Sequence, residues 1–339
     1  MKAGVKNGIK LSVFLLIVAG ILLYLNEKFF YYDISIWSSD YRVEKYQELP
    51  EDSIDVLFLG SSNVMSAINP LQLWEETGIQ SYAYATRKQT FPFSYGYLKD
   101  ALKTQKPKCV VLDAYSVFVE KWTNQLTDTD FHFGINMDSL SMASKTDILL
   151  NYVSKTEWLA YYFPLFKNHN YYKEWYESTD QTGEIFMGYC FADGSEYFED
   201  PEYTDVSAPM DNVDGIYLQK IIELCKEEGI DLFVVKTPVV YSDEDHQKLN
   251  AVKQMCEAYE VAYYDMCTDA EEWGYDYTCD MLNFFHSNTT GAVKVTKRLV
   301  EILSERYDFS DSATRQHADV WAAEYERMVE FRTSIGMWE

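Results

Sequence analysis

Four short segments of the chain are almost uninterruptedly apolar, and each runs into small or polar residues. They span residues 55–60, 108–115, 230–238 and 261–266, the last being the weakest. Strands buried on both faces of a parallel sheet have this pattern, because helices cover both sides of the sheet. The sequence therefore predicts at least four such strands.

Helical patterns lie between and after these segments. Apolar residues recur every three to four positions within 211–230, within 244–260 and after Gly291, and Gly229 is the expected end of the first helix. A last amphipathic helix is predicted at 318–331. The residues expected on the buried stripes are Val213, Ile216, Tyr217, Ile221, Leu224, Cys225, Leu249, Val252, Cys256, Tyr259, Val295, Leu299, Val300 and Leu303. Strands and helices alternating in this way predict an α/β fold with a parallel, doubly wound sheet.

Two regions interrupt this alternation. Residues 116–212 are rich in Tyr, Trp, Asp and Asn without a clean period, and we interpret them as a long aromatic-rich insertion folded over the sheet. Residues 31–53 mix aromatic and charged side chains and are interpreted as a connector. The expected organisation is a main domain at 54–305 that contains the insertion, followed by a helical extension at 306–339.

The N-terminal region, residues 1–30, predicts a cytoplasmic tail and a membrane-spanning helix. Three lysines precede a charge-free run of 15 residues from Leu11 to Leu25, and Lys28 follows it. Basic residues before an apolar run favour a cytoplasmic N-terminus with the remaining chain outside. A small-residue cleavage site is not evident, so we expect a retained signal anchor, with a removed signal peptide as the alternative.

Composition excludes some classes of function. A net charge of −25 argues against nucleic acid as a partner, because phosphates require a basic surface. The 28 tyrosines suit either sugar stacking or a tyrosine-rich core. The six cysteines fit no zinc or redox spacing; Cys109 is expected to be a buried thiol, and pairing among the others stays open. No metal-ligand motif, phosphate loop or dinucleotide fingerprint is present, so neither metal nor cofactor is expected.

One pair of residues suggests chemistry. Gly60, Ser61 and Ser62 directly follow the first predicted strand, and His286 lies just before the last helix of the predicted sheet domain. A serine nucleophile needs a base, usually a histidine. Both residues would lie at the carboxyl edge of the sheet, where open α/β folds place their active sites. The structural alternatives are a serine in a turn and a histidine on the surface.

These two segments carry a family resemblance. "FLGSSNVMSAINP" resembles the first block of the SGNH/GDSL hydrolase superfamily, and "DMLNFFHSNTTGA" resembles its last block. Residues 78–113 are similar in outline to membrane-anchored, DltD-like and O-acyltransferase-like bacterial members. The resemblance implies a three-layer, flavodoxin-like fold in which Ser62 is the nucleophile and His286 the base.

The chain departs from the family pattern in two places. Asn283 stands where the family has its acid, and an amide can orient an imidazole without supplying negative charge. Asp280, three residues further back, is the candidate substitute. In "ATRKQ", Arg87 or Lys88 lies near the expected glycine of the second block.

Five polar residues are the candidate substrate contacts. Asn63, Arg87, Gln89 and Asn288 lie in or beside the family blocks, and His169 lies among aromatic residues of the insertion. A histidine in such surroundings is more often a packing residue than a catalytic one. Asn288 also begins a formal glycosylation sequon, which we discount because it falls within the expected active-site loop.

Two functions from different classes follow. The first is an extracytoplasmic, membrane-anchored esterase or O-acyltransferase acting on a cell-envelope glycan or wall polymer through Ser62 and His286. The second is a catalytically degenerate relative that binds glycan or a polytopic membrane acyltransferase. Asn283, the basic residues near 87 and the aromatic insertion favour the second.

Overall fold

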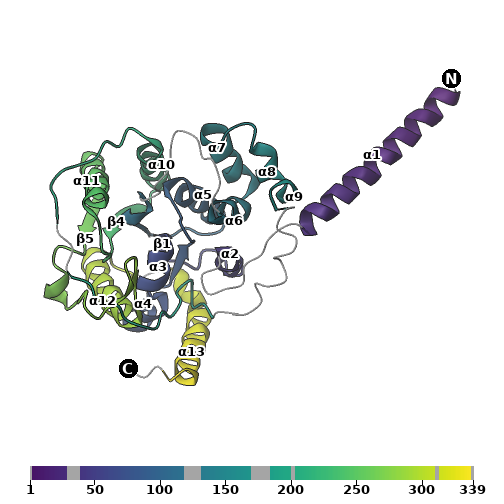
Figure 1. Cartoon of the computed structure of the whole chain (residues 1–339). Helices are drawn as coiled ribbons and strands as arrows, with labels where there is room; N and C mark the ends of the chain where they lie inside the picture. The colour runs from purple at the N-terminus through teal and green to yellow at the C-terminus, as the bar shows by residue number, and fades with distance from the viewer. Residues whose placement is uncertain are drawn as a thin grey trace.

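A five-stranded parallel sheet forms the centre of the molecule (Figure 1). The computed structural model describes residues 2–28, 39–117, 131–168, 184–199, 203–309 and 313–336. The strand order is β2-β1-β3-β4-β5, and every neighbouring pair is parallel. The strands are β1 (Val56–Gly60), β2 (Ser81–Ala85), β3 (Cys109–Asp113), β4 (Asp231–Lys236) and β5 (Ala262–Asp265). The predicted α/β class, the parallel sheet and all four predicted strands are confirmed.

Helices cover both faces of the sheet because side chains alternate along each strand. In β1, Leu57 and Leu59 join one buried cluster, whereas Val56 and Phe58 join the other. The first face carries α5 (Phe91–Ala101), α10 (Val213–Glu228) and α11 (Asp243–Ala258), and the second carries α3 (Ser62–Ala67), α4 (Pro70–Thr77) and α12 (Thr289–Arg306) (Figure 1). The result is a three-layer arrangement.

The predicted helices agree with α10, α11, α12 and α13 (Ala318–Ser334). Gly229 ends α10 with a φ of 70°, the left-handed conformation that glycine adopts readily. Two stripe assignments were wrong, since Ile216 and Tyr259 are 45% and 42% exposed. Ile216 precedes the buried Tyr217 and so points to a different side of α10, and Tyr259 lies beyond the last residue of α11.

Strand β2 is the sheet element that the apolar pattern missed. Its sequence, "SYAYA", alternates small and aromatic residues instead of running apolar. All five residues are nonetheless buried, although β2 ends the strand order. The Met187 carbonyl accepts a hydrogen bond from the Ala83 N–H at 2.9 Å, so the 184–190 segment covers this edge.

The expected connector is in part a component of the domain. Residues 39–47 form α2 (Ser39–Gln47), in which Arg42, Val43 and Tyr46 are buried. The Tyr46 ring stacks on Tyr84 of β2 with centroids 4.1 Å apart. The connector assignment is therefore wrong for this helix, because Tyr46 packs into a tyrosine-rich core. The earlier residues of the expected connector, up to 38, lie outside the described residues.

In the expected insertion, residues 184–199 and 203–212 contain no helix, whereas the segment 131–168 is helical. It contains α6 (Phe131–Ser139), α7 (Met142–Tyr152), α8 (Trp158–Tyr162) and α9 (Pro164–Asn168). The Tyr97 hydroxyl of α5 donates to the Asn136 carbonyl at 3.2 Å, so α6 packs on a helix of the domain. Residues 118–130 and 169–183, His169 included, lie outside the described residues.

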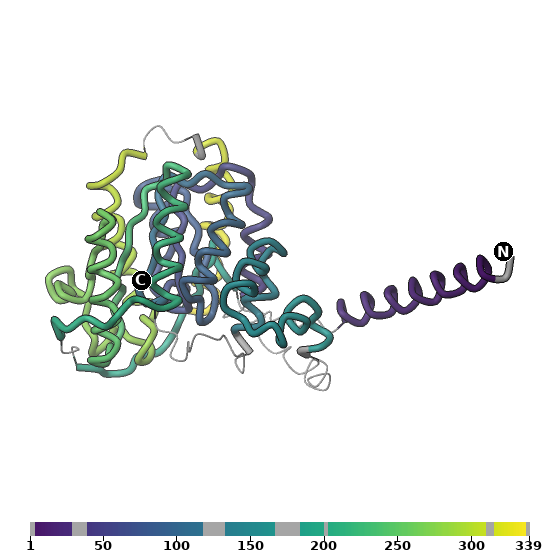
Figure 2. Tube along the Cα trace, turned by 90° about the horizontal axis from the view of Figure 1, so that it is seen from above, coloured from purple at the N-terminus to yellow at the C-terminus, as the bar shows by residue number. Residues whose placement is uncertain are grey.

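The N-terminal helix α1 (Lys2–Lys28) projects away from the domain (Figures 1 and 2). Its segment Gly4–Lys28 is long and apolar enough to cross a membrane, a property that signal sequences share. The six cysteines are free thiols, of which only Cys279 is exposed. Burial of Cys109 was predicted correctly.

Candidate active site

Ser62 lies at the carboxyl end of β1, as the first residue of α3. A Cβ on Gly60 would come within 2.4 Å of a Val64 methyl and 2.9 Å of the Asp113 Cβ. Only glycine therefore allows the chain to turn from β1 directly into α3. This turn leaves Ser62 half-buried at the sheet edge, between β2 and β3.

His286 is presented by a short antiparallel hairpin. The hairpin pairs β6 (Met281–Asn283) with β7 (His286–Ser287), and α12 follows immediately. A Cβ on Gly291 would lie 2.3 Å from the Asp280 carbonyl oxygen, so glycine lets α12 pack closely on the hairpin. His286 Nε2 lies 2.8 Å from Ser62 Oγ. The expectation that the two side chains lie within hydrogen-bond distance is confirmed.

Asn283 determines which imidazole nitrogen carries the proton. Its Oδ1 accepts the Phe285 backbone N–H at 3.0 Å and lies 2.9 Å from His286 Nδ1. A backbone N–H can only donate, so the atom facing it must be the amide oxygen. Nδ1 must then carry the hydrogen that it shares with Oδ1. Nε2 is left unprotonated and accepts the Ser62 hydroxyl hydrogen, as a general base requires.

The imidazole is held in its neutral form. Burial, together with the positive charge of Arg87, lowers the pKa of His286 to about 4. A neutral imidazole at neutral pH is the state that can remove a proton from serine. The amide of Asn283 adds no charge that would stabilise the imidazolium formed during that step.

Asp280 does not take the place of the missing acid. Its buried carboxylate accepts Lys294 Nζ at 2.6 Å and the Asp276 backbone N–H at 2.7 Å. No contact of Asp280 involves His286, because the carboxylate points toward α12 instead of the imidazole. The expectation that Asp280 orients the imidazole is therefore wrong, and Asn283 occupies that position.

Gln89 and Asn288 have structural contacts in place of the expected substrate contacts. The Gln89 side chain is fully buried and bonds Thr86 and Ser94 at 2.9 and 3.1 Å. The Asn288 side chain accepts the Gly291 N–H as the N-cap of α12, and its amide donates to two backbone carbonyls. Because its side-chain amide is buried and already hydrogen-bonded, Asn288 is also a poor glycosylation site, as expected from the sequence.

Arg87 remains a candidate substrate contact. Its backbone is fixed by Ser39 Oγ at 3.2 Å and by the Asn136 amide at 2.8 Å. Its positive charge is the second cause, after burial, of the lowered pKa of His286. His169 lies outside the described residues.

A buried polar network behind Ser62 was not anticipated. Asn63 is fully buried and donates to Asp113 Oδ2 at 3.3 Å and to Thr237 Oγ1, while the Thr237 hydroxyl donates to Asp113 Oδ1 at 3.1 Å. Burial raises the pKa of Asp113 to about 6. Asn63 is thus turned into the protein, contrary to its expected role at the substrate. The sequence signal that could have indicated this network is that Asp113 ends β3 and Thr237 directly follows β4.

Two further features at the site complete its chemistry. Among the described residues, the Ser62 backbone N–H has no acceptor, as is usual for the first residue of a helix. It can donate to an oxyanion formed at Ser62. Phe284 and Phe285, next to His286, are 52% and 49% exposed and give the rim an apolar part.

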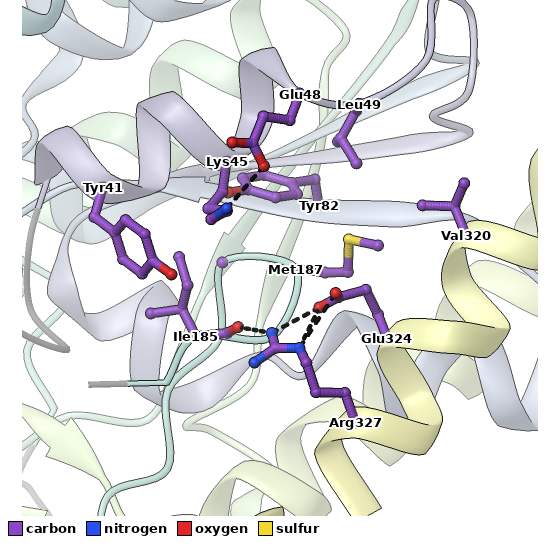
Figure 3. Close-up of a pocket in the computed structure, with 11 residues that line it drawn as sticks. Tyr41, Lys45, Glu48, Leu49, Tyr82, Ile185, Met187, Val320, Glu324 and Arg327 are labelled. Carbon is purple, nitrogen blue, oxygen red and sulfur yellow. Dashed lines mark hydrogen bonds and ion pairs between the residues drawn. The ribbon is translucent and has the colours of Figure 1, made fainter. Parts of the chain in front are cut away.

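A separate cavity of about 390 Å³ lies between α2, the 184–190 segment and α13 (Figure 3). It contains none of the site residues named above. Its charged groups are already paired: Lys45 bonds Glu48 at 2.8 Å, and Arg327 bonds Glu324 at 2.7 Å. No cluster of three or more His, Cys, Asp or Glu side chains suited to a metal occurs in the part of the chain that the structure describes.

Comparisons with known proteins give structural similarity only. No protein-family model and no curated protein sequence matches the chain. A protein from Desulfitobacterium hafniense, described as lipolytic and of the G-D-S-L family, superposes with a TM-score of 0.40 at 10% identity, covering 73% of this chain and 98% of its own. An acylhydrolase-type protein from Bacteroides fragilis gives 0.37 at 11% identity, covering 78% and 94%. A GDSL-like lipase from Bacteroides thetaiotaomicron gives 0.36 at 9% identity, covering 79% and 99%.

Proposed function

We propose that the protein is a membrane-anchored serine esterase or O-acyltransferase of the SGNH type. The observation that supports this proposal is the 2.8 Å contact between Ser62 Oγ and the unprotonated Nε2 of His286. Serine and histidine in this relationship can form an acyl-enzyme, a step shared by hydrolysis and transfer.

The reaction follows from the hydrogen bonds. His286 Nε2 removes the Ser62 proton while Oγ attacks the acyl carbonyl carbon, and the Ser62 N–H donates to the oxyanion. The imidazolium then gives its proton to the departing alkoxide, leaving an acyl ester on Ser62. Water or a sugar hydroxyl attacks this ester with His286 again as base, which returns free serine and releases the acid or the acylated sugar.

We place the enzyme outside the cytoplasm, anchored by α1, and propose a cell-envelope glycan or wall polymer as acyl carrier or acceptor. The lysines before the apolar run support this topology. For the transfer reaction, we also propose a polytopic membrane acyltransferase as a partner.

A catalytically degenerate binding protein is the second candidate, and one observation favours it. The neutral Asn283 leaves the imidazolium without the charge partner of a serine triad. Incubation of the full-length protein with an activated acetyl ester, followed by mass spectrometry, separates the two. Acetylation of Ser62, or hydrolysis of the ester that Ser62→Ala lacks, supports the enzyme. A Ser62 that is neither acetylated nor needed for hydrolysis supports the binding protein.

A further inference from the structure

Helix α9 is joined to the end of the N-terminal helix by one specific hydrogen bond. Pro164 opens α9, and the following N–H, on Leu165, has no acceptor within the helix. The Asn26 side chain, in the last turn of α1, accepts this N–H at 3.1 Å. In both views α8 and α9 lie next to the C-terminal end of α1 (Figures 1 and 2).

This hydrogen bond sets the depth of α9 relative to a bilayer that contains α1. The apolar run ends at Leu25, one residue before Asn26. The Lys28 ammonium then lies 5.8 Å from the centre of the Tyr24 ring. Tyrosine and lysine at the end of a spanning helix are typical of the headgroup region. Asn26, and with it α9, therefore lies at the level of the lipid headgroups.

The helices held at this depth expose large apolar side chains. Leu159 of α8 is 54% exposed, Phe163 between the helices 38%, and Phe166 of α9 46%. We call these three residues the α8–α9 patch. Single exposed apolar residues need no explanation in a soluble protein, but three within eight residues beside a membrane helix do.

We propose that the α8–α9 patch inserts into the lipid headgroup region of the bilayer that α1 spans, as a second, interfacial contact that orients the domain. The inference rests on the membrane anchoring proposed above. An apolar contact with the bilayer fits the charge of the chain, because a protein of net charge −25 is repelled by anionic lipids. Apolar side chains supply binding at an interface without basic residues.

The test uses the full-length protein in phosphatidylcholine vesicles that carry nitroxide-labelled phosphatidylcholine. Cys279, the one exposed cysteine, is first replaced by serine, and an environment-sensitive fluorophore is attached to a single new cysteine. Phe163→Cys and Leu159→Cys report on the patch. Tyr259→Cys, on an exposed site that follows α11, is the matched control, and Ile21→Cys reports on the span of α1.

If the α8–α9 patch inserts into the bilayer, lipid nitroxide should quench the labels at 163 and 159 several-fold more than the label at 259. Aqueous iodide should give the reverse order. If the label at 21 is quenched by lipid while those at 163 and 159 behave like the one at 259, the interfacial contact is wrong and the anchor stands. If the label at 21 also escapes lipid quenching, both the anchor and the interfacial contact are wrong.

Discussion

The side-chain oxygen of Asn283 lies 2.9 Å from Nδ1 of His286, where a serine triad has a carboxylate. Because the same oxygen also accepts the Phe285 N–H, it fixes both the ring orientation and the tautomer. The site therefore keeps the geometry of a triad and lacks one of its charges.

Asn283→Asp should increase hydrolysis of a simple acetyl ester. The carboxylate can accept the same two hydrogen bonds and adds the charge that stabilises the imidazolium. Loss of the orienting carboxylate costs about 10⁴ in turnover in a serine triad, which is the upper limit for the gain. The measurement is kcat with p-nitrophenyl acetate. Asn283→Ala is the control and should fall below wild type; an unchanged kcat for Asn283→Asp would show that His286 does not act as the base.

The pH dependence of kcat/KM should follow the lowered pKa of His286. With that pKa at about 4, the rate should rise through pH 4 and be level near pH 6.5, the ordinary histidine value. Arg87→Gln removes a positive charge, which after burial is the smaller cause of the lowered pKa of His286. The acid limb should therefore move partway toward pH 6.5. An acid limb already centred at 6.5 in the wild type would contradict the buried, neutral imidazole.

The same pKa predicts how stability depends on pH. Between about pH 4 and 6.5 the unfolded imidazole binds a proton that the folded one does not. The contribution of His286 to stability is therefore lost as the pH falls through this window. Urea unfolding of wild type and His286→Gln, compared at several pH values, should show a smaller acid destabilisation in the variant. If the free energy of unfolding depended on pH equally in the two proteins, the low pKa of His286 would be contradicted.

Gly60→Ala should destabilise the fold and disturb the site together. The new methyl group would overlap Val64 and Asp113, so α3 must shift, and overpacking of this kind costs about 1–3 kcal/mol. Chemical denaturation and kcat report the two effects. Ser61→Ala is the matched neighbour: the Ser61 hydroxyl is buried without a partner among the described residues, so its removal should be nearly neutral. Equal behaviour of the two variants would argue against the tight turn.

Asp280→Asn should reduce stability and leave the chemistry in place. It weakens a charge-assisted hydrogen bond to Lys294, an interaction worth about 1.5–3 kcal/mol. Thermal unfolding should therefore change, while kcat per folded molecule should stay near the wild-type value. Asp276→Asn, an exposed neighbour, should have little effect on either. Loss of kcat in a fully folded Asp280→Asn protein would restore Asp280 as the acid.

The sequence predicted the sheet and the pair at its edge for the same physical reason. Parallel strands buried on both faces leave long apolar runs. Ser62 follows the first of these runs and His286 precedes the last helix of the sheet domain, and both positions are expected at the carboxyl edge of such a sheet. Strand β2 was missed because its small and tyrosine residues obtain their burial from α2 and the 184–190 segment. Both of these segments are distant from β2 in the sequence.

The direction of a side chain was harder to predict than its location. Asn63, Gln89 and Asn288 all lie in the expected segments, yet each amide is used by a neighbouring backbone or side-chain group. Asp280 and Asn283 are three residues apart, and which of them faces the imidazole depends on the curl of the 276–280 turn. Sequence spacing does not contain that information.

The most direct test of the account is covalent labelling of Ser62 by a fluorophosphonate probe, which reacts with an activated serine. Full-length wild type, Ser62→Ala and His286→Gln are incubated with the probe, and the modified peptide is located by mass spectrometry. The account predicts modification of Ser62 in the wild type, none in Ser62→Ala and strongly slowed labelling in His286→Gln. A wild-type protein that stays unlabelled while a reference serine esterase in the same tube reacts would contradict it.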